Sequence, residues 1–357
     1  MLSLFWNNAL NRLERVNTLQ SLDIKFADQI RNCEDALLVE EHGLAILGCD
    51  PARERWNTVM GIFLPGPYPR GSVWVYDYAS GSDSLTELEL VGYEGDDLHP
   101  LGMAYDSSSS TLYMANHRTD GSRLDLFDLD FKGGRAVAKH RRFIKHPLIH
   151  TPNSIAVINN REIYVTNDHY FAIGQHGILA RIETYAAIPG GNVIHVDLAT
   201  DTARVLARIP FANGIELLND TTLAVSSTSS SSISIFEIEP KAHNLTLTNT
   251  FKVPFMPDNL SVDKNGALLI AGHPHPPSLT KFAETRALCN SEEGNTAEVC
   301  RATSAGSWIS DWTAEGGRRD LYVGTLYPSS CTALRDVERK TGIVTGLYGK
   351  GILVWKE

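Results

Sequence analysis

The sequence lacks any long apolar run. No stretch of its 357 residues approaches the roughly 18 consecutive apolar residues that a membrane-spanning helix needs. The apolar patch in the N-terminal segment MLSLFWNNALNRLERV is too short for the hydrophobic region of a signal peptide, and no small-residue cleavage site follows it. We therefore expect either a cytoplasmic protein or a secreted one whose signal has been trimmed.

Positive charge is also scarce. Lys and Arg number 32 against 42 Asp and Glu, which gives a formal net charge of −10. A nucleic-acid-binding protein normally carries a basic face, so nucleic acid is not an expected partner. An acidic excess suits a protein that binds cations, although it is equally common on an ordinary solvated surface.

Cysteine is rare, and its count of five is odd. Cys289 and Cys300 enclose a short polar segment and could form a disulfide. The positions of Cys33, Cys49 and Cys331 suggest no particular pairing.

Familiar catalytic motifs are missing as well. The chain contains no G-x-S-x-G nucleophile elbow, no H-E-x-x-H, no P-loop and no C-x-x-C. Long helical patterns are absent too, which argues against an α/β fold.

What is present is a repeat of alternating strands with a period of some 45 to 55 residues. Propeller blades of four strands have periods in this range, roughly 40–50 residues. Each repeat contains a hairpin of aliphatic and β-branched residues around a turn rich in Gly, Asn, Asp or Ser. The six predicted inner hairpins lie at 38–48, 101–117, 153–168, 213–227, 258–273 and 307–325. The sequence therefore predicts an all-β, six-bladed propeller.

We expect residues 31–357 to form the propeller as a single domain, after an N-terminal helical segment at 1–30. Leu10, Leu13 and Val16 recur at helical spacing, which predicts a short amphipathic helix. That helix could dock on the propeller or contact a membrane surface. The last strand, 351–357, is expected to complete the blade that the N-terminal residues begin. Residues 274–306 and 327–350 break the rhythm and are predicted to be long inserted loops.

Acidic and amide side chains fall in phase with the repeat, where the inner strands should reach the central channel. They are Glu34, Asp35, Asn167, Asp168, Asn213, Asp258 and Asn259. Oxygen atoms arriving from different blades around one axis suit Ca²⁺, which takes six to eight oxygen ligands. Residues of this kind also form turns at strand ends, and that explanation stays open for each one alone.

Several strings resemble those of the serum paraoxonase/arylesterase family. They are CED (33–35), LYMANH (112–117), TNDHYF (166–171), FANGIEL (211–217), DNLSVD (258–263) and GHP (272–274). The match runs in register from about residue 30 to 275, and TNDHYF and FANGI are its most specific parts. The resemblance implies a six-bladed propeller that hydrolyses lactones and aryl esters with two calcium ions in its channel.

The resemblance also implies roles for individual residues. The catalytic calcium would be held by Glu34, Asn167, Asn213, Asp258 and Asn259, and the structural calcium by Asp35, Asp168 and the backbone carbonyl of Met103. His117 matches one histidine of the family's proposed catalytic dyad. The other histidine corresponds to Leu101, which cannot transfer a proton, so His99, Asp258 or Glu34 would have to substitute.

Three functions follow as hypotheses. The first is a calcium-dependent hydrolase of lactones or esters, in which calcium polarises the carbonyl of a small, hydrophobic substrate. The second, motivated by Leu101, is a non-hydrolytic cyclase or pericyclase on the same propeller. The third is a binding propeller whose calcium is purely structural.

Overall fold

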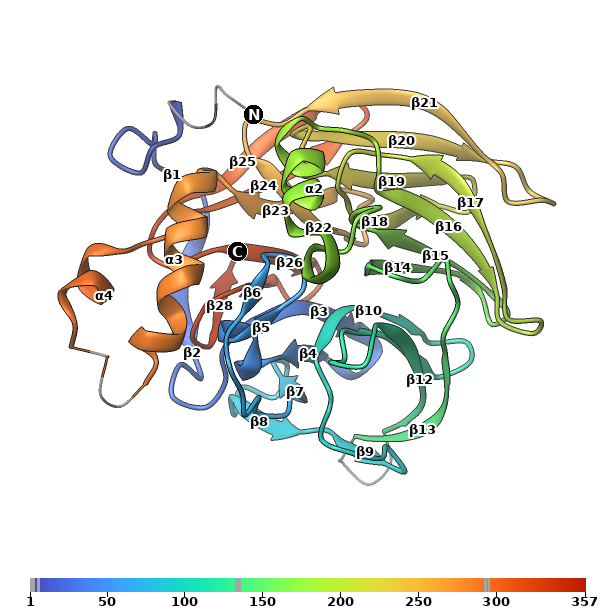
Figure 1. Cartoon of the computed structure of the whole chain (residues 1–357), viewed down its shortest axis with the longest axis horizontal. Coiled ribbons are helices and arrows are strands. Elements are labelled where there is room, and N and C mark those ends of the chain that lie inside the picture. Colours follow the sequence, from blue (N-terminus) through green and yellow to red (C-terminus); the bar gives the residue numbers. More distant parts are fainter. Residues whose placement is uncertain (1–3, 5–6, 132–135, 292–293, 295) are drawn as a thin grey trace.

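Six antiparallel sheets surround a central channel in the computed structural model, which describes residues 4, 7–131, 136–291, 294 and 296–357 (Figure 1). The innermost strands are β3 (Cys33–Val39), β10 (Pro100–Asp106), β14 (Pro152–Asn159), β18 (Ala212–Asn219), β22 (Met256–Val262) and β26 (Ser330–Asp336). The second strands are β4 (Leu44–Cys49), β11 (Thr111–Asn116), β15 (Glu162–Asn167), β19 (Thr222–Ser227), β23 (Leu268–His273) and β27 (Thr341–Gly346). The predicted six-bladed propeller is thereby confirmed.

The outer half of each blade is a second pair of strands. The third strands are β7 (Ser72–Asp77), β12 (Arg123–Asp130), β16 (Asn192–Asp197), β20 (Ser232–Ile238), β24 (Ser307–Thr313) and β28 (Ile352–Lys356). The fourth are β8 (Ser84–Glu87), β13 (Val137–Ile144), β17 (Thr202–Arg208), β21 (Leu245–Lys252), β25 (Gly317–Gly324) and β2 (Gln20–Lys25). Two short strands extend the blades further, β9 (Glu89–Val91) along β13 and β1 (Val16–Asn17) along β25.

The share of buried residues in each strand falls from the channel outward. Every residue of β23 is buried, whereas most of β21 is exposed. Within the described residues, six apolar clusters fill the spaces between neighbouring blades. One, for example, packs Leu126 of β12 against Val165 of β15. Because each blade buries both faces, the sheets form one continuous ring of core.

The ring closes between the two ends of the chain. β2 pairs with β28, with Ile24 opposite Leu353, so the N-terminal residues supply the outermost strand of the last blade. This is the pairing expected for the C-terminal strand. The assignment of 1–30 to a helical segment is therefore wrong for residues 16–17 and 20–25, which are strands.

The predicted amphipathic helix is not found in the described part of this segment. Residues 10–12 form a turn, Leu13 is buried against the propeller, and Val16 pairs with Val323. The helical spacing of these apolar residues reflects packing on the blades. Residues 1–3 and 5–6 lie outside the described residues. No helix among the described residues is long and apolar enough to cross a bilayer.

The sixth inner hairpin is β26–β27, which falls in the segment predicted to be an inserted loop at 327–350. Residues 307–325, predicted to be that hairpin, form β24 and β25, the outer half of the fifth blade. Inner and outer hairpins share the same alternation, so the pattern alone cannot distinguish them. The inserted segment 274–306 separates β23 from β24. In the sequence, this separation made the outer half of the fifth blade resemble the start of a new blade.

Leu4 and Asn7 are helical and precede the first strand, and the other helices in the described residues lie on connections between strands. In the described residues these are α2 (Ile173–Tyr185), α3 (Pro276–Cys289), α4 (Glu298–Ala302) and the 3₁₀ turns η1 (Glu40–His42) and η2 (Pro51–Glu54). The short hairpin β5 (Trp56–Asn57) and β6 (Ile62–Phe63) lies on the same face as α2 and α3 (Figure 1). The segment 274–306, predicted to be a loop, thus contains two helices.

Candidate metal centre and its cavity

Near its start, each innermost strand has a shift in its pairing register with the second strand of the same blade. The pairing of every inner hairpin is interrupted near its start, after the first paired residue or, in β22–β23, after the second, in the manner of a β-bulge, which re-aims the side chain at that point. The residues at the shift, in blade order, are Glu34, Leu101, Asn153, Asn213, Asp258 and Cys331. One repeated backbone feature therefore presents six side chains to the channel.

The inner strands approach one another closely at this level. A Cβ atom added to Gly102 would lie 2.0 Å from the carbonyl oxygen of Asn153, and one added to Gly214 would lie 2.6 Å from that of Asp258. No side chain fits there, so glycine permits the close approach. The polar groups carried by neighbouring inner strands are consequently held close to one another.

Four buried oxygen atoms at this level have no hydrogen-bond partner. They are Glu34 Oε2, Asn153 Oδ1, Asn213 Oδ1 and Asn259 Oδ1, and they come from β3, β14, β18 and β22. A buried acceptor left unsatisfied costs about 1–3 kcal/mol, so a native protein rarely gathers four of them. Their chemistry, with the carboxylate of Asp258 beside them, fits a hard cation such as Ca²⁺.

The amide groups of this site are held with their oxygens free. Asn213 Nδ2 donates to Thr228 Oγ1 at 3.0 Å. Asn259 Nδ2 donates to Glu34 Oε1 at 3.0 Å and to Thr332 Oγ1 at 3.0 Å. Because both amides donate their N–H groups to neighbouring side chains, their carbonyl oxygens remain available as ligands.

The electrostatics of the channel also favour a bound cation. Burial raises the pKa of Glu34 well above its usual range, and the charges of Asp258 and Asp35 raise it further, against the opposing charge of Arg53. Burial likewise raises the pKa of Asp35 to about 6, although its hydrogen bonds oppose this. Three carboxylates thus lie in one dry region, and a divalent cation would relieve their repulsion.

Asn167, predicted to be a calcium ligand, lies elsewhere in the hairpin. Its Oδ1 accepts hydrogen bonds from the backbone amides of His150 and Thr151, and its Nδ2 donates to Leu148 and Asn192. Every polar group of this side chain is therefore occupied in holding the backbone. The oxygen that β14–β15 offers to the channel belongs to Asn153, which the sequence analysis missed.

Of the residues predicted for a structural calcium, Asp35 and Met103 are in direct contact, but through a hydrogen bond, and Asp168 makes contacts of its own. Both oxygens of Asp35 are engaged, one by the Met103 backbone amide at 2.7 Å and the other by Thr332 and Ala36. Met103 thus faces Asp35 with its N–H group rather than its carbonyl. Asp168 instead accepts from His169 Nδ1 at 2.9 Å, and its Oδ2 is buried without a partner.

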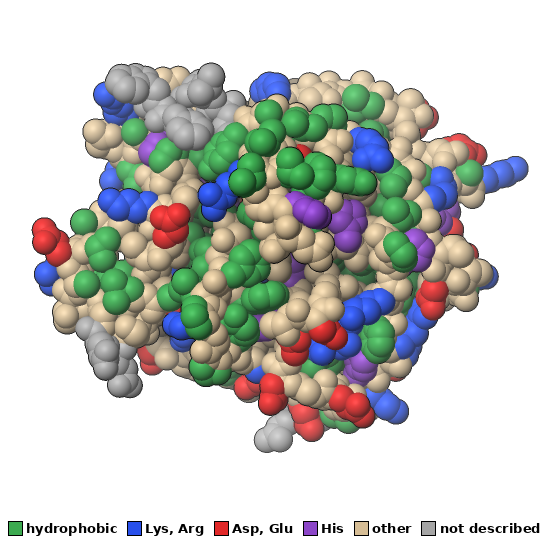
Figure 2. Space-filling model, viewed as in Figure 1, with side chains coloured by type: hydrophobic (Ala, Val, Ile, Leu, Met, Phe, Trp, Pro, Cys, Tyr) green, Lys and Arg blue, Asp and Glu red, His purple; other side chains and the backbone are tan. Residues whose placement is uncertain are grey.

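A cavity of about 90 Å³ opens above the unpartnered oxygens. Its polar floor is Glu34, Asn153, Asn213, Asp258 and His273. Its walls are apolar and include Met60, Leu101, Phe211, Met256, Leu279 and Leu347. Leu279 comes from α3 and Tyr185 from the end of α2, so both helices flank the opening. Figure 2 shows hydrophobic side chains gathered on this face of the molecule.

The histidines predicted to act in catalysis do not line this cavity. His117 Nε2 lies 2.5 Å from the carbonyl oxygen of Pro152, and its Nδ1 contacts the hydroxyl of Thr58. Burial lowers the pKa of His117, which favours the neutral ring. His99 lies between Asp50 and Asp97. His273 is the histidine on the cavity floor, with Nε2 2.9 Å from Asp258 Oδ2.

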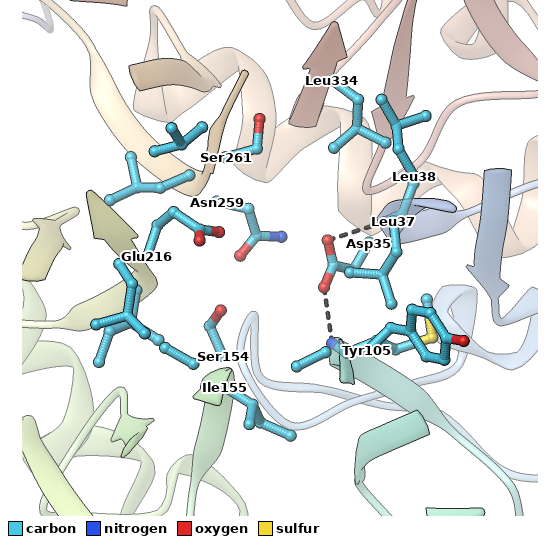
Figure 3. A pocket seen from close by; sticks show the side chains of 18 of the residues that line it. Asp35, Leu37, Leu38, Tyr105, Ser154, Ile155, Glu216, Asn259, Ser261 and Leu334 are labelled. Carbon is cyan, nitrogen blue, oxygen red and sulfur yellow. Dashed lines mark hydrogen bonds between the residues drawn. The ribbon is translucent and has the colours of Figure 1, made fainter. Parts of the chain in front are cut away.

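The other end of the channel holds a second cavity, of about 290 Å³ (Figure 3). Asp35, Ser154, Glu216, Asn259 and Ser261 are among its lining residues, and the side chains of Asp35, Ser154, Glu216 and Asn259 point toward its centre. Burial raises the pKa of Glu216 to about 8, with a further contribution from the charge of Asp35. The sequence analysis missed Glu216 because it follows FANGI as one residue of an otherwise aliphatic strand.

Together these features define a six-bladed β-propeller whose channel collects oxygen ligands beneath a hydrophobic cavity. The family profile named Arylesterase matches residues 60–305, and the chain belongs to this family, as the sequence motifs predicted. It is therefore an esterase-type hydrolase.

Relatives in sequence cover most of the chain. The dog "Serum paraoxonase/arylesterase 2" is 26% identical over 343 residues, covering 89% of this chain and 91% of the dog protein. The rabbit "Serum paraoxonase/lactonase 3" is 23% identical, covering 84% and 80%. Among solved structures, a gluconolactonase from Xanthomonas campestris aligns with a TM-score of 0.51 at 14% identity, covering 96% of this chain and 99% of its own. A luciferin-regenerating enzyme aligns with a TM-score of 0.55 at 12% identity, covering 95% of both chains. The structural likenesses show the fold alone.

Proposed function

We propose that this protein is a calcium-dependent hydrolase that opens lactones or cleaves aryl esters in the cavity beside α3. The observation that carries the proposal is the group of four unpartnered, buried oxygens from four blades. The names of the relatives, which include paraoxonase, arylesterase and lactonase, support the class of substrate.

Five side chains would hold the calcium ion: Glu34, Asn153, Asn213, Asp258 and Asn259. When bound there, calcium would supply a Lewis acid for the substrate carbonyl. The proposal contains one such ion, because the contacts of Asp35, Met103 and Asp168 give a second ion at those residues no support.

The chain itself positions the substrate and handles the proton. The apolar walls exclude water from all but the polar floor of the cavity, where electrostatic interactions are strongest. Glu34 Oε2 is the acceptor available to a water molecule there, since Oε1 is engaged by Asn259. His273 holds Asp258 in place through Nε2. In this scheme Glu34 orients the attacking water, accepts its proton and returns that proton to the leaving oxygen as the ester C–O bond breaks, and His117 is a structural residue.

A hydrophobic substrate suits the surroundings of the cavity. Ile178 of α2 is 79% exposed and Tyr185 at the end of that helix is 53% exposed, beside the cavity that Tyr185 also lines. Exposed apolar side chains of this kind are costly in water and gather where apolar ligands bind. We therefore propose a small, largely apolar lactone or aryl ester as substrate.

We also propose that the protein works in an oxidising compartment. Cys33 and Cys49 form a disulfide within the first hairpin, in addition to the predicted pair Cys289–Cys300. Disulfides persist mainly in secreted and other oxidised proteins. The first pair was missed because register, rather than spacing along the chain, brings Cys33 opposite Cys49.

The proposed function is tested by removing and restoring calcium. Hydrolysis of a panel of lactones and aryl esters should disappear after treatment with EGTA and return when Ca²⁺ is added. Calcium should also raise Tm, and Asn213→Ala should abolish both responses. Full activity in protein shown by elemental analysis to be free of divalent metal would overturn the proposal.

A further inference from the structure

Cys331 occupies the sixth of the register-shift positions that face the channel, on β26. Its side chain is fully buried, and it carries the only free thiol, because the other four cysteines form two disulfides. Its neighbours around the channel are therefore the residues at the equivalent positions of the fifth and first blades, Asp258 and Glu34.

Asp258, His273 and Cys331 present three different donor atoms within a small volume. One carboxylate oxygen, one ring nitrogen and the sulfur all lie within 4.8 Å of one another, and all three residues are buried. His273 Nε2 and Asp258 Oδ2 are 2.9 Å apart. Two ligands bonded to one ion at about 2.0–2.1 Å are separated by about 2.9–3.4 Å at ordinary bond angles.

The protein alone does not satisfy this group. His273 is only 4% exposed, yet its Nδ1 has no hydrogen-bond partner. The Cys331 thiol lies 3.5 Å from the carbonyl oxygen of Ser329 and also interacts with the Asp258 side chain. The buried thiol lies beside a carboxylate and an imidazole nitrogen, and an ion bound through His273 Nε2 would join these three donors, whereas Nδ1 would keep no protein partner.

We propose that Asp258, His273 and Cys331 form a site for a borderline-soft divalent transition metal, with Zn²⁺ as the reference ion. Thiolate, imidazole and carboxylate are the donors that zinc takes in proteins, usually four in a tetrahedron. Calcium, a hard cation, does not choose sulfur, so this site is chemically distinct from the oxygen site beside it. Binding releases the thiol proton of Cys331 to solvent.

The fourth position of such a site faces the cavity above. Asp258 and His273 both line the 90 Å³ cavity, whereas Cys331 packs behind them against Leu347 and Met256. A three-ligand site open toward a cavity leaves room for one exchangeable ligand, such as water. Asp258 belongs to both donor sets, which couples the two sites through one carboxylate.

The site is tested with protein produced in medium supplemented with Zn²⁺ or Co²⁺, so that the ion can enter during folding. Elemental analysis should find about one zinc per chain, and the cobalt form should show a thiolate-to-cobalt charge-transfer band in the near ultraviolet. Since Cys331 is the only free thiol, that band reports on this residue alone. Cys331→Ser should abolish the band and lower zinc occupancy by at least about tenfold, and His273→Gln should lower occupancy similarly.

Asn213→Ala separates this proposal from the calcium proposal. This variant should lose the calcium-induced rise in Tm but keep the cobalt band, while Cys331→Ser should do the reverse. Folded wild-type protein that contains no zinc and shows no cobalt band would overturn the transition-metal site. Zinc occupancy unchanged in Cys331→Ser would overturn it as well.

Discussion

At the scale of single residues, two asparagines in one hairpin have opposite roles. Asn153 leaves its oxygen unpartnered at the channel, whereas Asn167 uses its oxygen and its N–H groups to tie down the loop before β14. A ligand whose oxygen is unsatisfied without metal costs stability in the metal-free protein. An asparagine whose polar groups are all hydrogen-bonded stabilises the metal-free protein, and its removal lowers that stability.

We predict that Asn153→Ala abolishes most of the calcium-induced rise in Tm and does not lower the metal-free Tm, because the removed oxygen stabilises only the bound state and is unsatisfied without metal. Asn167→Ala should instead lower the metal-free Tm, by the equivalent of about 1–3 kcal/mol, while the calcium response persists. Thermal unfolding in EGTA and in excess calcium measures both effects. A calcium response that survives in Asn153→Ala and disappears in Asn167→Ala would restore the assignment made from the sequence.

The sequence pattern could not distinguish Asn153 from Asn167, and the reason is geometric. Asn167 pairs with Pro152, the residue immediately before Asn153, so the two asparagines lie at the same end of the hairpin. Asn153 and Asn167 fit the spacing of the blade repeat equally well, and both have polar neighbours in the sequence. Only the register shift after Pro152 determines which side chain faces the channel, and a register shift leaves no mark on the alternation of apolar residues. Glu34, Asn213, Asp258 and Asn259 were predicted because they fall in phase with the blade repeat, and each lies at the register shift of its inner strand.

Glu216 makes stability depend on pH. Its carboxyl group keeps its proton up to pH about 8 in the folded protein, because burial raises its pKa. The unfolded chain releases that proton near an ordinary glutamate pKa, about 4.3. The contribution of Glu216 to folding is therefore fully present below that value and is lost as the pH rises through about 8.

We predict that Glu216→Gln removes this loss, so the variant becomes progressively more stable than the wild type between pH 5 and pH 9. Thermal unfolding at several pH values in that range measures the difference. The exposed Glu237→Gln serves as the control for removal of one negative charge. A difference between Glu216→Gln and wild type that is constant across this range would show that Glu216 is ionised throughout.

At the scale of elements, the position of α3 determines the shape of the 90 Å³ cavity. Proline at its first turn and the His275 side chain, which accepts a hydrogen bond from the Ser278 amide, fix where the helix begins. One side of the helix packs Leu279, Phe282 and Ala283 into an apolar cluster, and Leu279 also lines the cavity. The sequence marked this segment as a break in the blade rhythm. Its position over the channel depends on tertiary contacts that the pattern does not contain.

We predict that Leu279→Trp reduces kcat/KM for bulky lactones by about tenfold or more, because the larger ring fills part of a 90 Å³ cavity. Small lactones should be affected less, and the calcium-induced rise in Tm should remain. Leu288→Trp is the matched control, since Leu288 belongs to the same helix but is 48% exposed. Equal losses for small and bulky substrates would indicate that Leu279 does not shape the substrate site.

At the scale of the whole molecule, the propeller must join its last blade to its first. The sequence predicted the number of blades and the pairing of the two chain ends, because both follow from the repeat. It placed the sixth inner hairpin one hairpin too early, because identical alternation describes inner and outer strands. The closing blade has no disulfide among its four strands, so packing and pairing hold it in place.

Trp355 is the centre of that packing. It is fully buried in a cluster that combines residues of the fifth blade and of the sixth blade, including Leu22 of β2. Gly342 leaves room for its ring, since a Cβ atom there would lie 1.9 Å from it. The indole of Trp355 therefore links β28 to the fifth blade and to β2.

We predict that Trp355→Ala lowers the free energy of unfolding by roughly 3–5 kcal/mol, because the lost ring leaves a cavity at the seam. Trp355→Phe should cost much less, since most of the apolar contact is kept and the indole N–H has no partner to lose. Leu247→Ala, at a residue 56% exposed, controls for substitution on a blade surface. Denaturant unfolding measures all three, and hydrogen exchange should show β2 and β28 opening first in Trp355→Ala. If the alanine variant is no less stable than the Leu247 control, ring closure depends on strand pairing alone.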